Sequence, residues 1–336
     1  MGAAVSLLIG IAGTTLATHE RAWLADRRVA GLILFSRNFT DPAQLRALVA
    51  DVRSVRRRLL LCVDQEGGRV QRLAQGFTPL PALAAIGQLY AADRTAGRAA
   101  CLLHAWIMAT EVLAYDIDLS LAPVADLGFG NAAIGDRAFS AAPQDCAELT
   151  ALYVDRMWRC GMAATLKHFP GHGAAGPDSH HEAVVDPRAL GELARTDLLP
   201  FAAGIAAGAH AVMTAHISYP QVDAAAAGYS KRWIGKILRG MLRFRGVVMG
   251  DDVSMAGAAA AGSIAERVRA HYRAGCDLVL ACQPDAVPEA LSVQPQPRLK
   301  GTHQRLLKAR DPKWARHLLE GEEFAERVHR LKELLS

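Results

Sequence analysis

Polar side chains that could carry out chemistry follow four apolar, strand-like runs of the sequence. They are Asp64, the pair Lys167 and His168, His216, and the pair Asp251 and Asp252. A single charged residue at a strand end has an ordinary explanation, because it can cap a turn or form a salt bridge. Four such ends favour an active site if the strands form a barrel, since their carboxyl ends then open on one face.

The run over residues 64–72 (DQEGGRVQR) places a carboxylate at a strand end, then a Gly-Gly turn, then two arginines. Gly-Gly allows the backbone to return sharply. Asp64 can accept hydrogen bonds from sugar hydroxyls, and an arginine of the run can donate to them. The alternative is an Asp–Arg salt bridge that only holds the loop.

Four histidines fall within residues 168–181, in a stretch with Gly, Pro and Ala that predicts a loop. Metal binding is one interpretation, because imidazole is a common metal ligand, but neither HxH nor HExxH occurs there. A second interpretation is an acid/base dyad, in which Asp178 holds one nitrogen of His180 and leaves the other to exchange a proton. The third is that these histidines are merely solvated.

Asp251 and Asp252 are adjacent, so the sequence invites an interpretation as paired carboxylates. Neighbouring residues of a strand point to opposite sides, however, so only one of the two can face the barrel axis. We expect the other to cap the following turn or to bind a neighbouring strand or loop.

Eight apolar runs must position these side chains. The predicted strands are residues 5–9, 31–36, 59–64, 118–123, 162–168, 211–216, 246–251 and 277–282. Most are apolar throughout, which is typical of parallel strands that are covered on both faces.

Helical patterns separate the strands. They cover residues 44–58, 99–115, 142–160, 188–203, 231–242 and 263–274. Asp41 and Pro42 fit an N-cap and a first-turn proline for the first of them. Strand and helix in alternation, eight times over, predict an α/β fold of the (β/α)8 TIM-barrel type. A doubly wound open sheet is the alternative, but it usually has fewer strands, and neither GxGxxG nor a Walker sequence is present.

Residues 283–316 are rich in Pro, Gln and Lys and show no clear period. We predict an irregular segment there, followed by a closing helix over residues 322–335. One catalytic barrel domain is expected to span residues 1–336, because α/β barrels routinely exceed about 250 residues as a single domain.

Composition argues against several classes of protein. The chain is 51% hydrophobic and 21% charged, as globular proteins are. Its net charge of +5 comes without a basic stripe of interleaved aromatics, so we expect no nucleic-acid partner. No apolar run reaches the ~18 residues of a membrane span, so we expect no membrane association. No Lys or Arg precedes Arg21, so the basic part of a signal peptide is missing and a cytoplasmic location is expected.

The chain has six cysteines, and none forms a CxxC pair. Three of them lie in or beside apolar, strand-like runs. We therefore predict buried free thiols, which implies a reducing compartment.

Several blocks of the sequence resemble glycoside hydrolase family 3, in particular its single-domain bacterial β-N-acetylglucosaminidases. They are residues 31–38 (GLILFSRN), 64–72 (DQEGGRVQR), 121–126 (LAPVAD), 134–139 (IGDRAF), 167–173 (KHFPGHG) with 178–180 (DSH), 213–220 (MTAHISYP) and 246–255 (GVVMGDDVSM). They follow the family's order over roughly residues 5–283, and together they are far more specific than any one block.

The resemblance implies a retaining glycosidase that works through a covalent glycosyl-enzyme intermediate, with no metal and no other cofactor. By motif position, Asp251 matches the nucleophile, His180 the general acid/base and Asp178 its dyad partner. The residues that match the sugar-holding set of the −1 subsite are Asp64, Arg72, Arg137, Lys167 and His168. Retaining glycosidases ordinarily use two carboxylates ~5–5.5 Å apart, so an Asp–His pair here replaces one of them.

The chain departs from the family pattern at two glycines. Gly250 stands where family members usually have Ser or Thr before the nucleophile, so we expect a lost hydrogen bond and a more flexible strand end. Gly10 stands near the place where related first strands commonly end in Asp. If that Asp supports the barrel mouth, we expect a slower or less stable enzyme.

We therefore expect exo-hydrolysis of terminal β-linked N-acetylglucosamine from muropeptide-type sugars (GlcNAc-anhydroMurNAc) during peptidoglycan recycling, by a monomeric enzyme. One alternative is a β-glucosidase or β-glycoside phosphorylase on the same scaffold. A second is a metal-dependent barrel hydrolase that uses the loop histidines, and a third is a non-catalytic sugar-binding relative.

Overall fold

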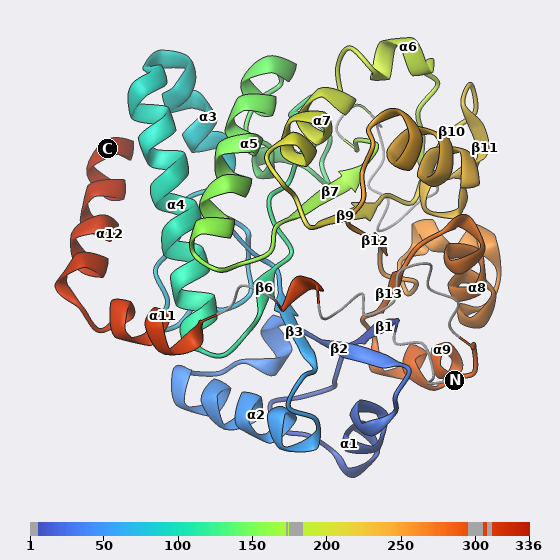
Figure 1. Cartoon of the computed structure of the whole chain (residues 1–336), viewed down its shortest axis with the longest axis horizontal. Coiled ribbons are helices and arrows are strands. Elements are labelled where there is room, and N and C mark those ends of the chain that lie inside the picture. The colour runs from blue at the N-terminus through green and yellow to red at the C-terminus, as the bar shows by residue number, and fades with distance from the viewer. Residues whose placement is uncertain (1–5, 173, 175–183, 295–304, 308–310) are drawn as a thin grey trace.

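Each of the eight apolar runs contributes one strand to a single sheet in the computed structural model, which describes residues 6–172, 174, 184–294, 305–307 and 311–336 (Figure 1). The strands are β1 (Leu7–Ile9), β2 (Val29–Leu34), β3 (Leu60–Val63), β6 (Leu119–Ser120), β7 (Thr165–Phe169), β9 (Ala211–Thr214), β12 (Val247–Gly250) and β13 (Leu278–Ala281). Hydrogen-bonded neighbours follow the order β6-β3-β2-β1-β13-β12-β9-β7, and the pairs are parallel.

The two ends of this strand order meet, which closes the sheet into a barrel. Val124, in the segment that follows β6, forms a parallel bridge with Lys167 of β7. The Ala125 amide donates to the Lys167 carbonyl at 2.7 Å, and the Thr165 amide donates to Ala122 at 2.8 Å. The predicted (β/α)8 TIM barrel is therefore confirmed, and the open doubly wound sheet is excluded.

Burial explains why the strands are apolar throughout. Every residue of the eight strands is buried except His168, which is partly exposed at the end of β7. One face of each strand fills the barrel interior and the other lies beneath the surrounding helices, so neither face selects for polar residues. The one strand position that is not fully buried carries a predicted site residue.

The helices around the barrel follow most of the predicted ranges. They are α1 (Thr18–Ala25), α2 (Pro42–Val55), α3 (Leu83–Ala92), α4 (Arg94–Ala114), α5 (Pro143–Arg159), α6 (Leu190–Leu193), α7 (Leu198–Ala206), the π-helix η4 (Arg232–Met241), α8 (Ile264–Ala274), α9 (Val287–Leu291), α11 (Pro312–Leu319) and α12 (Glu322–Leu335). The Asp41 carboxylate accepts from the amides of Ala43 and Gln44, which confirms the predicted cap of α2.

Two predicted segments differ in the structure. The helix expected over residues 188–203 is divided into α6 and α7, because Pro200 has no amide to bond to the preceding turn and fits the first turn of a new helix. The segment expected to be irregular, residues 283–316, contains α9 and the first part of α11. Helices α11 and α12 both pack on α4, far from them in sequence (Figure 1). α1 and α3 lie outside the predicted helical stretches.

Shorter strands lie outside the barrel sheet. β4 (Gln65–Gly67) and β5 (Val70–Gln71) form a hairpin directly after β3, while β8 (Val184–Val185), β10 (Ile217–Tyr219) and β11 (Asp223–Ala226) form a separate small sheet.

All six cysteines are buried and free, as predicted. Among the described residues, no helix is both long and apolar enough to cross a bilayer.

Candidate active site

A cavity of about 460 Å³ lies at the carboxyl ends of the barrel strands. Six of the eight predicted site residues line it, namely Asp64, Arg72, Arg137, Lys167, His168 and Asp251. They come from segments after β3, β5, β6 and β12 and from β7 itself. The barrel topology thus gathers residues that lie up to 187 positions apart in the sequence, as the strand-end argument predicts.

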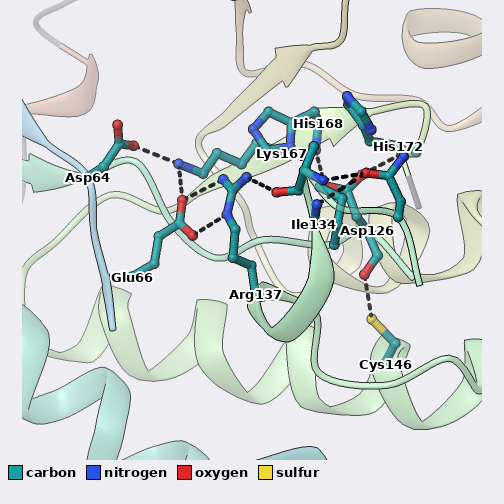
Figure 2. Close-up of polar contacts among 12 residues, drawn as sticks. Asp64, Glu66, Asp126, Ile134, Arg137, Cys146, Lys167, His168 and His172 are labelled. Atoms are coloured by element: carbon teal, nitrogen blue, oxygen red, sulfur yellow. Dashed lines mark hydrogen bonds and ion pairs between the residues drawn. The ribbon is translucent and has the colours of Figure 1, made fainter. Parts of the chain in front are cut away.

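Lys167 lines the cavity and contacts two carboxylates, those of Asp64 and Glu66 (Figure 2). Its side chain is 3% exposed, and its Nζ lies 2.6 Å from Asp64 Oδ1 and 2.6 Å from Glu66 Oε1. Burial alone would lower the pKa of Lys167, but the two carboxylates outweigh it and hold that pKa above its ordinary value. The lysine therefore stays a cation, and Asp64 keeps further lone pairs toward the cavity.

Glu66 joins Lys167 to Arg137 (Figure 2). Its two carboxylate oxygens accept from Arg137 Nε at 2.8 Å and from Nη2 at 2.9 Å. Burial alone would raise the pKa of Glu66, but Lys167 and Arg137 hold it well below the ordinary value. The Arg137 Nη1 also donates to the Ala133 carbonyl, which fixes the guanidinium plane at the cavity wall.

Glu66 was not among the predicted site residues, although the sequence carries a signal for it. Asp64 and Glu66 are two positions apart in an extended segment, so their side chains share a face. Both in fact contact the ammonium group of Lys167.

Asp126 anchors the segment that carries His168 and His172 (Figure 2). Asp126 is fully buried. Its Oδ2 accepts from the His168 amide at 3.1 Å and lies 2.8 Å from His168 Nδ1. Its Oδ1 accepts from the His172 amide at 2.7 Å. Burial alone would raise the pKa of Asp126, but its contacts with His168 lower it overall. An ionised Asp126 only accepts, so His168 carries its proton on Nδ1. Asp126 ends one of the family-like blocks but was not predicted as a site residue.

Asp251 and Asp252 both line the cavity, but their hydrogen bonds differ. Asp251 follows β12, is partly buried, lines the cavity and accepts the Asp252 amide at 2.8 Å. Asp252 Oδ1 accepts the amides of Ser254 and Cys282, each at 3.0 Å. These contacts confirm the predicted turn cap and the predicted link to a neighbouring strand end for Asp252. Burial of its carboxyl group raises the pKa of Asp252 above the ordinary value.

The β4–β5 hairpin supplies the arginines. Asp64 pairs with Lys167, so the predicted alternative of an Asp64–Arg salt bridge is not found among the described contacts. Arg72 lines the cavity with its guanidinium 5.9 Å from the ring centre of Phe35. Arg69 lines the cavity as well, and it pairs with Asp136 at 3.4 Å where both side chains are exposed. Both arginines of this run therefore line the cavity, and among the described ion pairs Arg72 has no carboxylate partner.

His216, the fourth polar strand end, contacts the backbone next to the cavity and does not line the cavity. It is 2% exposed, and its Nε2 lies 3.1 Å from the carbonyl oxygen of Asp252. Its predicted place near the other strand ends is correct, but it contacts the backbone beside Asp251 and not the cavity.

The predicted dyad, His180 and Asp178, lies outside the described residues. The structure does describe where that segment begins and resumes. Before it, the Asp126 carboxylate holds the His172 amide and the Tyr219 hydroxyl donates to the Gly171 carbonyl. After it, β8 pairs with β10.

A metal interpretation finds no support among the residues that the structure describes, where no group of three or more His, Cys, Asp or Glu side chains could hold an ion. The rings of His168 and His172 have centroids 6.1 Å apart, and His168 is already bonded to Asp126. His180 and His181 lie outside the described residues, so chelation remains the test of this alternative.

Comparisons with known proteins agree with this geometry. Residues 5–308 match the model of the glycosyl hydrolase family 3 N-terminal domain. The chain is 57% identical over 286 residues to a β-hexosaminidase of Stenotrophomonas maltophilia, covering 85% of each chain, and 55% identical to one of Xanthomonas axonopodis pv. citri, covering 85% of this chain and 86% of that one. Among solved structures, NagZ from Neisseria gonorrhoeae in complex with N-trifluoroacetyl-D-glucosamine superposes with a TM-score of 0.92 at 38% identity over 99% of both chains.

Proposed function

This chain belongs to glycosyl hydrolase family 3 and is a β-N-acetylhexosaminidase, and on that premise we propose that it is a retaining exo-β-N-acetylglucosaminidase with Asp251 as its nucleophile. The observation that carries the proposal is the position of Asp251 in one cavity with Asp64, Arg72, Lys167 and His168. A nucleophilic carboxylate facing several hydrogen-bonding groups that hold a sugar ring is the arrangement that glycosyl transfer needs.

In the first half-reaction, Asp251 attacks the anomeric carbon while the bond to the leaving oxygen breaks. His180 gives its proton to that oxygen, and a glycosyl ester of Asp251 forms. In the second half-reaction, neutral His180 takes a proton from water, whose oxygen attacks the anomeric carbon and releases Asp251. Two inversions give net retention. An unperturbed imidazole pKa of ~6.5 suits both steps near neutral pH.

The polar lining of the cavity suits the sugar. Asp64 is held by Lys167 and keeps acceptor capacity for hydroxyl groups, while Arg72 and the protonated Lys167 donate. The Neisseria relative, which was solved in complex with N-trifluoroacetyl-D-glucosamine, supports a 2-acylamino sugar as the substrate. We propose terminal N-acetylglucosamine of muropeptide-type sugars as the substrate, and peptidoglycan recycling by a monomer as the setting. Six buried free thiols favour a reducing compartment such as the cytoplasm.

Release of the aryl group from an aryl β-N-acetylglucosaminide tests the activity, with the aryl β-glucoside as the control for the glucosidase alternative. The anomer of the first-formed sugar, followed by NMR, tests retention, because a retaining enzyme releases the β-anomer first. In phosphate buffer, free sugar as the product favours the hydrolase and sugar-1-phosphate favours the phosphorylase.

Trapping with a fluorinated N-acetylglucosaminyl fluoride then locates the nucleophile. The labelled peptide is expected to carry the sugar on Asp251, and Asp251→Ala is expected to show neither label nor turnover. A label on any other carboxylate would overturn the assignment. Full activity after exhaustive chelation would exclude the metal-dependent alternative, and sugar binding without turnover would favour the non-catalytic one.

A further inference from the structure

The imidazole of His271 packs against the backbone of Gly250, the residue that precedes Asp251. A Cβ atom on Gly250 would lie 2.5 Å from His271 Nδ1 and 2.7 Å from its Cγ. A Cβ atom on Gly228 would lie 2.7 Å from Cε1 of the same ring. The imidazole of His271 is therefore enclosed between two glycine backbones, one of which immediately precedes Asp251. The ring of His271 thus occupies the space that a side chain at position 250 would need.

Hydrogen bonding fixes the orientation of this ring. His271 comes from α8, is fully buried, and its Nδ1 lies 3.0 Å from the Gly228 carbonyl oxygen. A carbonyl only accepts, so Nδ1 carries the proton. Burial lowers the pKa of His271 to about 3, so the ring is neutral at ordinary pH. The ring then acts through its shape and its single donated hydrogen bond.

A second imidazole holds the other side of Asp251. The rings of His271 and His216 pack with centroids 5.4 Å apart, and Tyr229 packs on His271 at 4.6 Å. His216 Nε2 donates to the carbonyl of Asp252. One ring therefore abuts the residue before Asp251, and its neighbour bonds the residue after it. Together they restrict the backbone on both sides of the carboxylate.

We infer that His271 is a positioning residue that holds the end of β12 in place and so aims the Asp251 carboxylate. This inference rests on the proposed role of Asp251 as nucleophile. A displacement of about 1 Å at a reacting group can cost about 100-fold in rate, so a ring packed against the neighbouring Cα can control catalysis without touching the substrate.

A double-mutant cycle tests this coupling. Gly250→Ala alone is expected to lower kcat by about 100-fold, because the added methyl group meets an enclosed ring that has no free direction to move. His271→Ala alone is expected to lower kcat by about tenfold with little change in KM. The double variant gives the methyl group its space, so its kcat is expected to exceed that of Gly250→Ala. Such a reversal is the signature of residues in direct contact.

Two further variants separate positioning from general stability. His271→Asn keeps a donor for the Gly228 carbonyl and is expected to recover part of the kcat that His271→Ala loses. Tyr272→Phe is the matched control, since it removes a buried 2.6 Å hydrogen bond to Ser6 from the same helix without facing Gly250. Its melting temperature is expected to fall while its kcat stays that of the wild type.

The readouts are kcat and KM on an aryl β-N-acetylglucosaminide, the rate of labelling by the fluorinated sugar, and the melting temperature. A loss of melting temperature in His271→Ala with unchanged kcat and labelling rate would overturn the inference, as would wild-type turnover by Gly250→Ala. Wild-type protein without any turnover or label would instead overturn the proposed function, and the positioning role with it.

Discussion

The ammonium group of Lys167 and the carboxylate of Asp64 lie 2.6 Å apart although 103 residues separate them in the sequence. The same ammonium group lies 2.6 Å from Glu66, so one buried cation balances two carboxylates beside the cavity. Removal of one partner from a buried ion pair leaves the other charge unpaired, which costs far more than the loss of an exposed pair.

Lys167→Met is expected to lower the free energy of unfolding by about 3–5 kcal/mol, because Asp64 and Glu66 lose their shared cation in a buried site. The loss of charge at the sugar site is also expected to lower kcat/KM by about 100-fold. Thermal unfolding and steady-state kinetics check both. Arg159→Met is the control, since the Arg159–Asp155 pair on α5 is exposed and should leave both quantities nearly unchanged.

The pH dependence of the same variant follows from Glu66. Because Lys167 and Arg137 hold the pKa of Glu66 below its ordinary 4.5, its stabilisation is present above pH 4.5 and is lost as pH falls toward the folded-state pKa. Without Lys167 that folded-state pKa rises. The acid limb of unfolding is therefore expected at higher pH in Lys167→Met than in the wild type, and equal acid limbs would contradict the charge assignment.

Asp126→Asn is expected to lower kcat/KM by about 100-fold. In the variant an NH2 group replaces one of the two carboxylate oxygens, so a donor that the wild-type carboxylate accepts would meet another donor. The His168 ring and the His172 amide use different oxygens of Asp126, so one of the two would lose its acceptor. Asp277→Asn is the matched control, since Asp277 is a buried partner of Arg239 that precedes β13 at the opposite end of the barrel. It should lose stability and keep kcat/KM; equal kinetic losses in both variants would refute the anchoring role of Asp126.

His180→Ala is expected to slow turnover by about 10²–10⁴-fold for substrates with a poor leaving group, since the oxygen must then leave without a proton. Aryl substrates with acidic leaving groups should be affected much less. His181→Ala serves as the neighbour control. Comparison of kcat/KM across a series of leaving-group pKa values gives the answer, and a uniform loss across the series would rule out the acid/base role.

Glu111, on α4, is a buried carboxyl group outside the active site that should make stability depend on pH. Its Oε1 accepts from the amide and hydroxyl of Thr78, and burial raises its pKa to about 7. The folded state therefore binds a proton more tightly than the unfolded chain, so the stabilisation is complete below about pH 4.5 and is lost as pH rises through about 7. The loss is about 3 kcal/mol.

Glu111→Gln removes this titration and keeps an acceptor for Thr78. Between pH 5 and pH 8 the melting temperature of the wild type is expected to fall relative to that of Glu111→Gln, because only the wild type loses the stabilisation from a protonated Glu111. A difference that stays constant over this range would mean that Glu111 does not titrate there.

The sequence by itself determined the barrel and the positions of most candidate site residues. Apolar runs of strand length mark where the chain is covered on both faces, and parallel strands all end on one side, so Asp64, Lys167 and Asp251 had to lie near one another. Local chemistry also fixed the Asp41 cap of α2 and the turn cap formed by Asp252. The roles of His180 and Asp178 stay predictions, carried by the family resemblance.

Only the tertiary structure decided which side chains share a charge or a space. Glu66 meets Arg137 across 71 residues, Asp126 meets His168 across 42, and His271 fills the place beside Gly250. The division of α6 from α7 and the helices within residues 283–316 likewise depend on long-range packing. Periodicity reports only which face of an element is buried. The identity of the atoms opposite that face is set by how the elements pack, and pKa values and backbone rigidity follow from those atoms.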